Sequence, residues 1–198
     1  MKFRLFGIEI HVTVLFAVTV AFLLTIDRTG ILIPMFAAAF LHEFGHIVAM
    51  KLFNTAPKQI ILHPCSVTIV DRFPSHGGKS DIIISLSGPF ANFIAALPLY
   101  IAFKFTGKLE FANWYAVQII TGAFNLIPVN GLDGGRILLI LAGKAFGSQR
   151  AVLILKIVSL LFAGALIIAG ITLIVRFESN PSLLFVGVYL AILNIIKL

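Results

Sequence analysis

The chain has 198 residues, of which 60% are hydrophobic and 12% are charged, and its mean hydropathy is +1.07. Soluble domains carry about twice this fraction of charged residues, and a core of this size could not bury so much apolar surface. The composition therefore excludes an ordinary water-soluble domain and indicates a lipid bilayer as the solvent. A formal net charge of +7 would suggest a nucleic-acid partner in a soluble protein, but we attribute it to membrane topology and expect no nucleic acid.

Six stretches are apolar and approach the roughly 20 residues that a spanning helix needs. In chain order they run from about Ile8 to Ile26, Ile31 to Phe53, Asp81 to Phe103, Phe111 to Ile127, Val152 to Val175, and Ser182 to Ile196. Between the fourth and fifth, "GGRILLILAGKAF" is too short to span and predicts a partial or interfacial helix. No small-residue cleavage site follows Ile26, so we expect the first span to be retained. The predicted fold is an all-α polytopic membrane protein, with residues 1–198 forming a single domain.

The basic residues predict the orientation of these spans, because cytoplasmic loops carry an excess of Lys and Arg. Eleven of the 15 fall on one side: Lys2, Arg4, Lys51, Lys58, Arg72, Lys79, Arg136, Lys144, Arg150, Lys156 and Lys197. The other side receives Arg28, Lys104, Lys108 and Arg176. We therefore expect an integral protein of the cell membrane with both termini in the cytoplasm.

The longest polar interval runs from Asn54 to Ser80 and is assigned to the cytoplasm. Within it "QIIL" and "VTIVD" flank "HPCS". Two short β-branched runs around a proline-containing turn predict a small β-hairpin over residues 59 to 71.

The motif "HEFGH", residues 42 to 46, lies inside the second predicted span. On a helix, His42 and His46 are one turn apart and both imidazoles can reach one metal ion from the same face. Glu43 can then reach a water on that ion and act as a general base. A pattern this short also arises by chance, but in lipid each ionisable side chain costs about 2.5 to 3.5 kcal/mol. The apolar setting therefore favours a metal site over simple packing.

A catalytic zinc ion needs three protein ligands and an open position for water. The single cysteine, Cys65, excludes a cysteine cluster and an intrachain disulfide framework. The remaining candidates are His11, His63, His76 and Asp133. We favour Asp133, because Pro128 breaks the preceding helix and Gly134 and Gly135 follow it, as in the irregular backbone that lines cavities at membrane depth. The alternative is that Asp133 caps the helix that follows.

Two motifs, "HEFGH" and "NLIPVNGLDGG", resemble the signatures of the site-2 protease family of intramembrane zinc metalloproteases. The opening "IEIHVTVLF" and the segment "SGPFAN" resemble the sporulation branch, the stage IV sporulation protein FB group. The resemblance implies His42, His46 and Asp133 as ligands of one Zn²⁺ ion and Glu43 as the catalytic residue. It also implies substrate-binding or oxyanion roles for Asn92 and Asn125. Gly131 departs from the pattern, since many members have a proline there.

The resemblance further implies the partners. The substrate would be a membrane-embedded or membrane-associated protein, such as a membrane-tethered transcription factor or a pro-sigma factor, and a membrane inhibitor protein would be a second partner. The sporulation branch commonly carries a C-terminal nucleotide-sensing domain, and no soluble regulatory domain is visible in this sequence.

Two other classes of function stay open at this point. A transporter or channel also places ionisable residues at depth beside broken helices. A catalytically silent membrane scaffold would keep the fold, although such a chain typically loses a ligand or the base, and neither is lost here.

Overall fold

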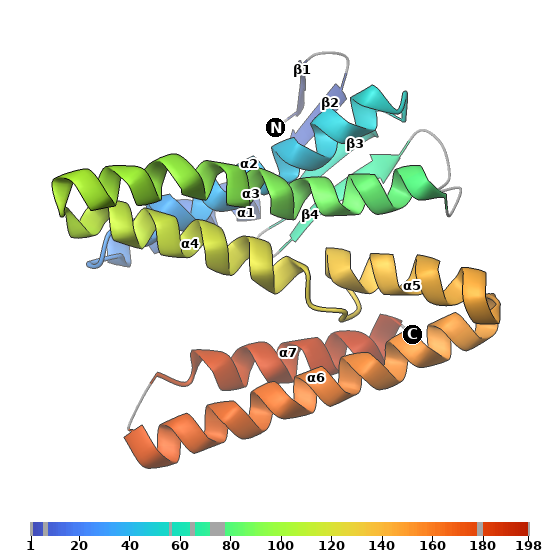
Figure 1. Ribbon diagram of the computed structural model, residues 1–198. Coiled ribbons are helices and arrows are strands. Elements are labelled where there is room, and N and C mark those ends of the chain that lie inside the picture. Colours follow the sequence, from blue (N-terminus) through green and yellow to red (C-terminus); the bar gives the residue numbers. More distant parts are fainter. Residues whose placement is uncertain are drawn as a thin grey trace. The chain divides into compact units, whose positions relative to one another are not determined.

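The computed structural model describes residues 2–5, 8–55, 57–63, 66–71, 78–177 and 180–197. Most of these residues are helical, and the remaining regular structure is a small sheet (Figure 1). The strands are β1 (Lys2–Leu5), β2 (Ile8–Val12), β3 (Pro57–His63) and β4 (Ser66–Asp71). The helices are α1 (Val14–Ile26), α2 (Leu32–Leu52), α3 (Lys79–Thr106), α4 (Leu109–Asn125), α5 (Asp133–Phe146), α6 (Ser148–Phe177) and α7 (Ser182–Lys197).

The chain divides into two compact units. The first contains residues 1–76 and 87–122, and the second contains residues 77–86 and 123–198. The first unit holds the sheet, α1, α2 and most of α3 and α4. The second holds α5, α6, α7 and the first turns of α3.

The sheet has the order β1-β2-β3-β4. The β1–β2 and β3–β4 pairs are antiparallel, whereas β2 and β3 run parallel. Strands β3 and β4 thus pair within the interval where the sequence predicts a hairpin, and β1 and β2 extend that pair to four strands. The β4 strand lies at one edge of the sheet.

The predicted start of the first span at Ile8 is wrong. Residues Ile8–Val12 form β2, and α1 begins only at Val14. The physical reason is local: Ile8, Ile10 and Val12 alternate with polar residues, a period that suits a strand. The Thr13 side chain then accepts a hydrogen bond from the Phe16 N–H at 3.2 Å and caps the helix.

A helix lies in each of the six predicted stretches, and three are long and apolar enough to cross a membrane by length and composition. These three are Leu32–Leu52, Lys79–Thr106 and Ser148–Arg176. The partial helix predicted after the fourth stretch corresponds to α5. Helix α2 ends at Leu52 with Phe53 as its C-cap. Asn54, the next residue, has a left-handed φ of 56° and stops the helix where the polar interval begins.

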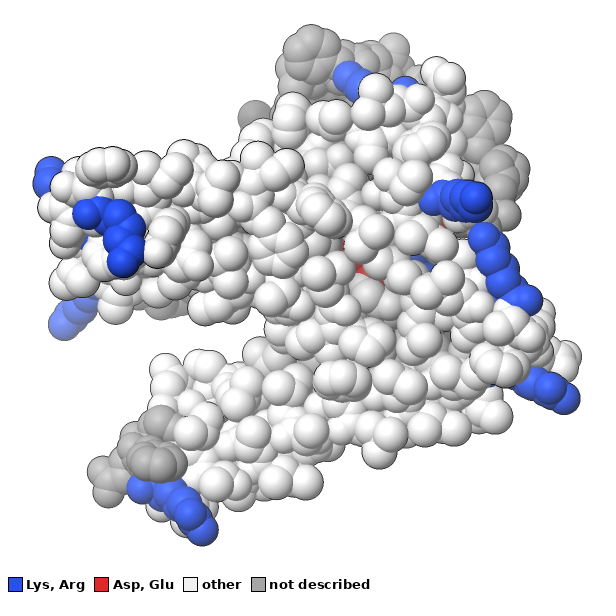
Figure 2. All heavy atoms as spheres, viewed as in Figure 1, with Lys and Arg blue, Asp and Glu red and all other residues white. Residues whose placement is uncertain are grey.

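The helices carry apolar side chains outward and polar side chains inward. Phe40 and Phe105 are 71% and 87% exposed, while Asn92 and Ser159 are fully buried. Figure 2 shows Lys and Arg near the ends of helices and uncharged surface along their lengths. This is the distribution expected of helices solvated by lipid, where polar groups must find partners within the protein.

In the first unit, α3 packs between α2 and α4. Small residues allow the α2–α3 contact: a Cβ atom added to Gly45 would lie 2.5 Å from the Ser87 carbonyl oxygen and 2.9 Å from the Ala91 Cβ. In the second unit, α6 and α7 are antiparallel neighbours (Figure 1). Ala163 of α6 and Leu190 of α7 form a buried core with Val129, which lies between α4 and α5.

Candidate metal centre

Helix α2 places His42 and His46 one turn apart on a buried face. Their Nε2 atoms are 3.1 Å apart, and the rings meet edge to face with centroids 4.7 Å apart. The exposed fractions of the two residues are 6% and 7%. The predicted pair of imidazoles is therefore assembled, with one nitrogen of each ring directed at the same point.

The other ring nitrogens are held by α3. His42 Nδ1 lies 2.9 Å from Asn92 Oδ1, and His46 Nδ1 lies 3.5 Å from Ser87 Oγ. Histidines that bind metals usually donate their second N–H to such a group, which fixes both the tautomer and the ring orientation. Both rings are thus supported on the side away from the shared point.

The α3 backbone passes directly against these rings at Gly88. A Cβ atom added there would lie 2.6 Å from His46 Cε1 and 2.9 Å from His42 Cε1. Both separations are far inside the roughly 3.5 to 4.0 Å of ordinary carbon contacts. Glycine is required here for close approach, because any side chain would displace the imidazoles.

The donor geometry fits zinc. Two Zn–N bonds of about 2.0 to 2.1 Å at a tetrahedral angle separate the nitrogens by about 3.3 Å. The observed Nε2–Nε2 distance of 3.1 Å is close to this value. Without an ion, the same contact is a hydrogen bond in which one ring carries its proton on Nε2.

Glu43 follows His42 directly and is partly exposed, unlike the two histidines. A successive residue on a helix is rotated by about 100°, so Glu43 lies on the part of α2 next to the face that carries the two histidines.

Asp133 lies in the second unit, as the first residue of α5. The N-cap residue is Leu132, which makes no side-chain capping bond, so Asp133 does not hold the N-cap position that was its alternative role. Backbone packing after it is tight, since a Cβ atom at Gly134 would collide with the Leu126 carbonyl and one at Gly135 with the Val129 carbonyl. The two glycines thereby fix the start of α5 and the position of Asp133 within this unit.

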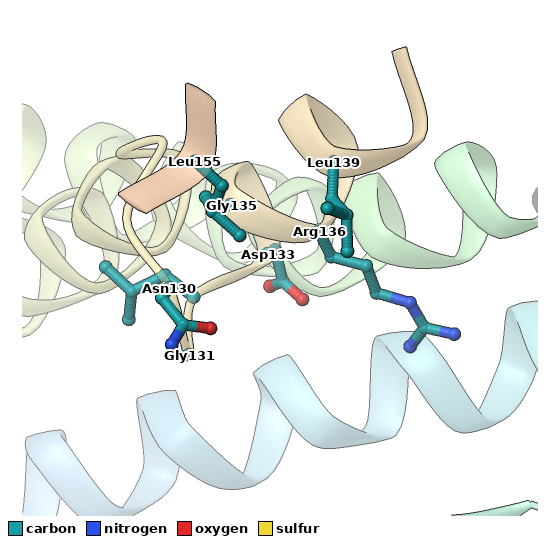
Figure 3. A pocket seen from close by; sticks show the side chains of 8 residues that line it. Asn130, Gly131, Asp133, Gly135, Arg136, Leu139 and Leu155 are labelled. Carbon is teal, nitrogen blue, oxygen red and sulfur yellow. The ribbon is translucent and has the colours of Figure 1, made fainter. Parts of the chain in front are cut away.

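A cavity of about 320 Å³ adjoins Asp133 in the second unit. Figure 3 shows that Asn130, Asp133 and Arg136 extend to the same side of the chain at the start of α5. The Arg136 guanidinium also lies 4.0 Å from the carboxylate of Asp81, which is 9% exposed. The loop is anchored by the Asn130 N–H, which donates to Ser159 Oγ at 2.9 Å.

The remaining predicted residues have varied positions. Asn92 is fully buried on α3, and Asn125 is the half-buried last residue of α4. His11 is half-buried on β2. Cys65 and His76, and the side chain of His63, lie outside the described residues.

The sequence does not predict three residues that the structure places against the histidine rings or in hydrogen-bond contact with the Asn92 side chain that supports His42. Ser87 and Gly88 contact the rings as described, and Gln118 accepts a hydrogen bond from Asn92 at 2.6 Å. A signal for Gln118 was present, since it is an amide in the apolar stretch "FANWYAVQIITGAF". A polar residue inside a span is expected to have a partner in the protein.

No protein-family model matches the chain. A zinc metalloprotease of Methanocaldococcus jannaschii is 30% identical over 158 residues, which are 73% of this chain and 46% of that protein. The stage IV sporulation protein FB of Bacillus subtilis is 24% identical over 149 residues, 73% of this chain and 51% of that protein.

A solved structure has the same fold. The site-2 protease from Methanocaldococcus jannaschii superposes with a TM-score of 0.67 at 23% identity, over 97% of this chain and 92% of that one. The resemblance to the site-2 protease family is confirmed. The fold of the solved site-2 protease is shared over nearly the whole chain. The chain spans about half the length of the curated relatives that it matches.

Proposed function

We propose that this protein is an intramembrane zinc metalloprotease, a zinc metalloendopeptidase of the site-2 protease type. The observation that carries the proposal is the buried His42–His46 pair, with facing Nε2 atoms and supported Nδ1 atoms. The similarity to a zinc metalloprotease and to the site-2 protease fold supports the same function.

His42, His46 and Asp133 are the proposed ligands of one Zn²⁺ ion. The two imidazoles supply neutral nitrogen donors and Asp133 supplies a carboxylate, a donor set that suits a catalytic zinc with an open position. When bound, the ion lowers the pKa of a water and polarises a carbonyl group.

Glu43 is the proposed general base and acid. Its carboxylate takes the proton of the attacking water as the peptide carbonyl carbon is attacked, and then delivers that proton to the leaving amine. The proton moves from water to the Glu43 carboxylate and from there to nitrogen, so the residue is regenerated at the end of the cycle. Asn125 is the proposed contact to the substrate backbone, as the family motif implies.

The proposed substrate is a membrane-embedded or membrane-associated protein, such as a membrane-tethered transcription factor or a pro-sigma factor, with a membrane inhibitor protein as a further partner. We place six spans in the bilayer with both termini in the cytoplasm, so that cleavage occurs near the cytoplasmic face. A helical substrate must become extended to be attacked, and its freed amides need partners in lipid. The β4 edge could supply them by strand addition. Proline substitutions in the hairpin that leave cleavage unchanged would exclude this route.

The decisive experiment compares wild type with Glu43→Gln during co-expression with a panel of candidate single-span or membrane-tethered substrates, together with zinc quantification of both proteins. A protease keeps its zinc and loses cleavage in the variant. A transporter or channel, or a silent scaffold, shows no cleavage that depends on Glu43 across the panel, and that result refutes the proposal.

A further inference from the structure

A buried chain of hydrogen bonds runs from Gln118 on α4 through Asn92 on α3 to His42 on α2. Asn92 Nδ2 donates to Gln118 Oε1 at 2.6 Å and to the Ala38 carbonyl at 2.9 Å. Asn92 Oδ1 lies 2.9 Å from His42 Nδ1. Asn92 and Gln118 are 0% and 1% exposed, so water does not substitute for any of these contacts.

The orientation of the Asn92 amide follows from the partners it meets. A backbone carbonyl such as that of Ala38 can only accept hydrogen bonds, so the amide nitrogen must face it. The amide oxygen then faces His42. Rotating the amide by 180° would set its oxygen against the carbonyl of Ala38 and the oxygen of Gln118.

This orientation determines the protonation of His42. Because Asn92 Oδ1 is an acceptor, His42 must carry its proton on Nδ1. A neutral His42 then presents an unshared electron pair on Nε2, the atom that faces His46 Nε2 at 3.1 Å. That is the tautomer a metal ligand needs at this position.

Gln118 is the end of this chain of hydrogen bonds that lies opposite His42. Its Oε1 engages one of the two Asn92 Nδ2 hydrogens, while Ala38 engages the other, so both amide hydrogens are used. An amide buried in a span is costly unless it is hydrogen-bonded, and this bond gives Gln118 a defined partner.

We propose that Gln118 and Asn92 are positioning residues that hold His42 as its Nδ1–H tautomer for metal binding. The inference rests on the proposed function. It gives Asn92 a role behind the ligand instead of the substrate contact that its motif implies, since both amide hydrogens and the amide oxygen are already engaged.

The first test replaces Gln118 by Met, which keeps the volume and removes the acceptor, and by Glu, which keeps an acceptor oxygen in either protonation state. Zinc affinity of the full chain in detergent is measured by competition with a chromophoric chelator. The His42 tautomer is read from ¹⁵N NMR of histidine-labelled protein. We expect Gln118→Met to weaken zinc binding about tenfold, the lower end of the range for such outer partners, and Gln118→Glu to retain it.

A second test uses Asn92→Asp. A carboxylate has two equivalent acceptor oxygens, so it can hold His42 Nδ1–H without any fixed orientation. In this background Gln118→Met should no longer weaken zinc binding, because there is no amide left to orient. A purely structural role predicts that the two substitutions act independently, as separate packing defects do.

The outcomes separate this inference from the proposed function. Wild-type protein that binds no zinc refutes the proposed function. Zinc binding and a His42 tautomer that are both unchanged in Gln118→Met, or an effect of equal size in the Asn92→Asp background, refute the positioning role while leaving the metal site in place. Gln118→Ala replaces Gln118→Met in both tests if the latter does not fold.

Discussion

Replacing Gly88 by alanine should disrupt the metal centre through one methyl group. The new Cβ atom would lie 2.6 Å from His46 Cε1 and 2.9 Å from His42 Cε1. Carbon atoms pack at about 3.5 to 4.0 Å, so at least one ring must move by roughly 1 Å.

A displacement of this size exceeds the roughly 0.2 Å tolerance of metal–ligand distances. The histidine that moves can therefore no longer hold the ion in its original geometry. We expect zinc affinity to fall by about 100-fold or more, beyond the effect of losing one outer partner. The overpacking itself should lower the free energy of unfolding by about 1 to 3 kcal/mol.

Chelator competition measures the affinity, and thermal unfolding with chelator present measures the packing defect alone. Gly187→Ala is the matched control, because its Cβ atom would lie 2.9 Å from Ile167 Cγ1 in the α6–α7 contact, within the unit that does not contain the histidines. Gly164→Ala gives the baseline, since its Cβ atom meets nothing within 4 Å. If Gly88→Ala binds zinc as tightly as Gly187→Ala, the close approach of α3 to the imidazoles is incorrect.

Three further substitutions test other parts of the structure. The Leu32 N–H and the Thr29 hydroxyl donate hydrogen bonds to the Asp27 carboxylate and lower its pKa below 3.8. The stability that these bonds contribute is fully present above the unfolded-state pKa and is lost as the pH falls through the folded-state pKa. The difference in melting temperature between wild type and Asp27→Asn should thus be constant above about pH 5 and shrink progressively as the pH falls from there through the folded-state pKa; a change centred near neutral pH would contradict this. Ser159→Ala leaves the Asn130 N–H without its 2.9 Å acceptor and should cost about 1 to 3 kcal/mol in denaturant unfolding; an unchanged midpoint would mean that the bond contributes nothing. Asn54→Ala places a less tolerant residue at φ 56° and should cost about 1 kcal/mol, with Asn54→Gly, which should cost nothing, as the control.

The residues that could be predicted from sequence are those whose role depends on local spacing. His42 and His46 lie four apart on a helix, so a 3.6-residue period is enough to put them on one face. The apolar stretch "IPMFAAAFLHEFGHIVAMKLF" likewise specifies a long helix, and α2 covers all of it except the last residue, Phe53.

Other features depend on information that spacing does not contain. Gln118, Asn92 and His42 come from three helices, and their contact follows from how those helices pack. The predicted start of the first span at Ile8 is wrong for a different reason. The prediction rests on the total hydrophobicity of the stretch from Ile8 to Ile26, whereas the two-residue alternation at its beginning forms β2.

Gly131 has a φ angle of +93°, which a proline ring, restricted to about −65°, cannot adopt. A Gly131→Pro substitution would therefore force the loop before Leu132 and Asp133 onto a different backbone path. The peptide groups of this segment would then present their N–H and C=O dipoles in other directions. A ligand that binds to the backbone of this loop should consequently distinguish the wild-type chain from the Gly131→Pro variant.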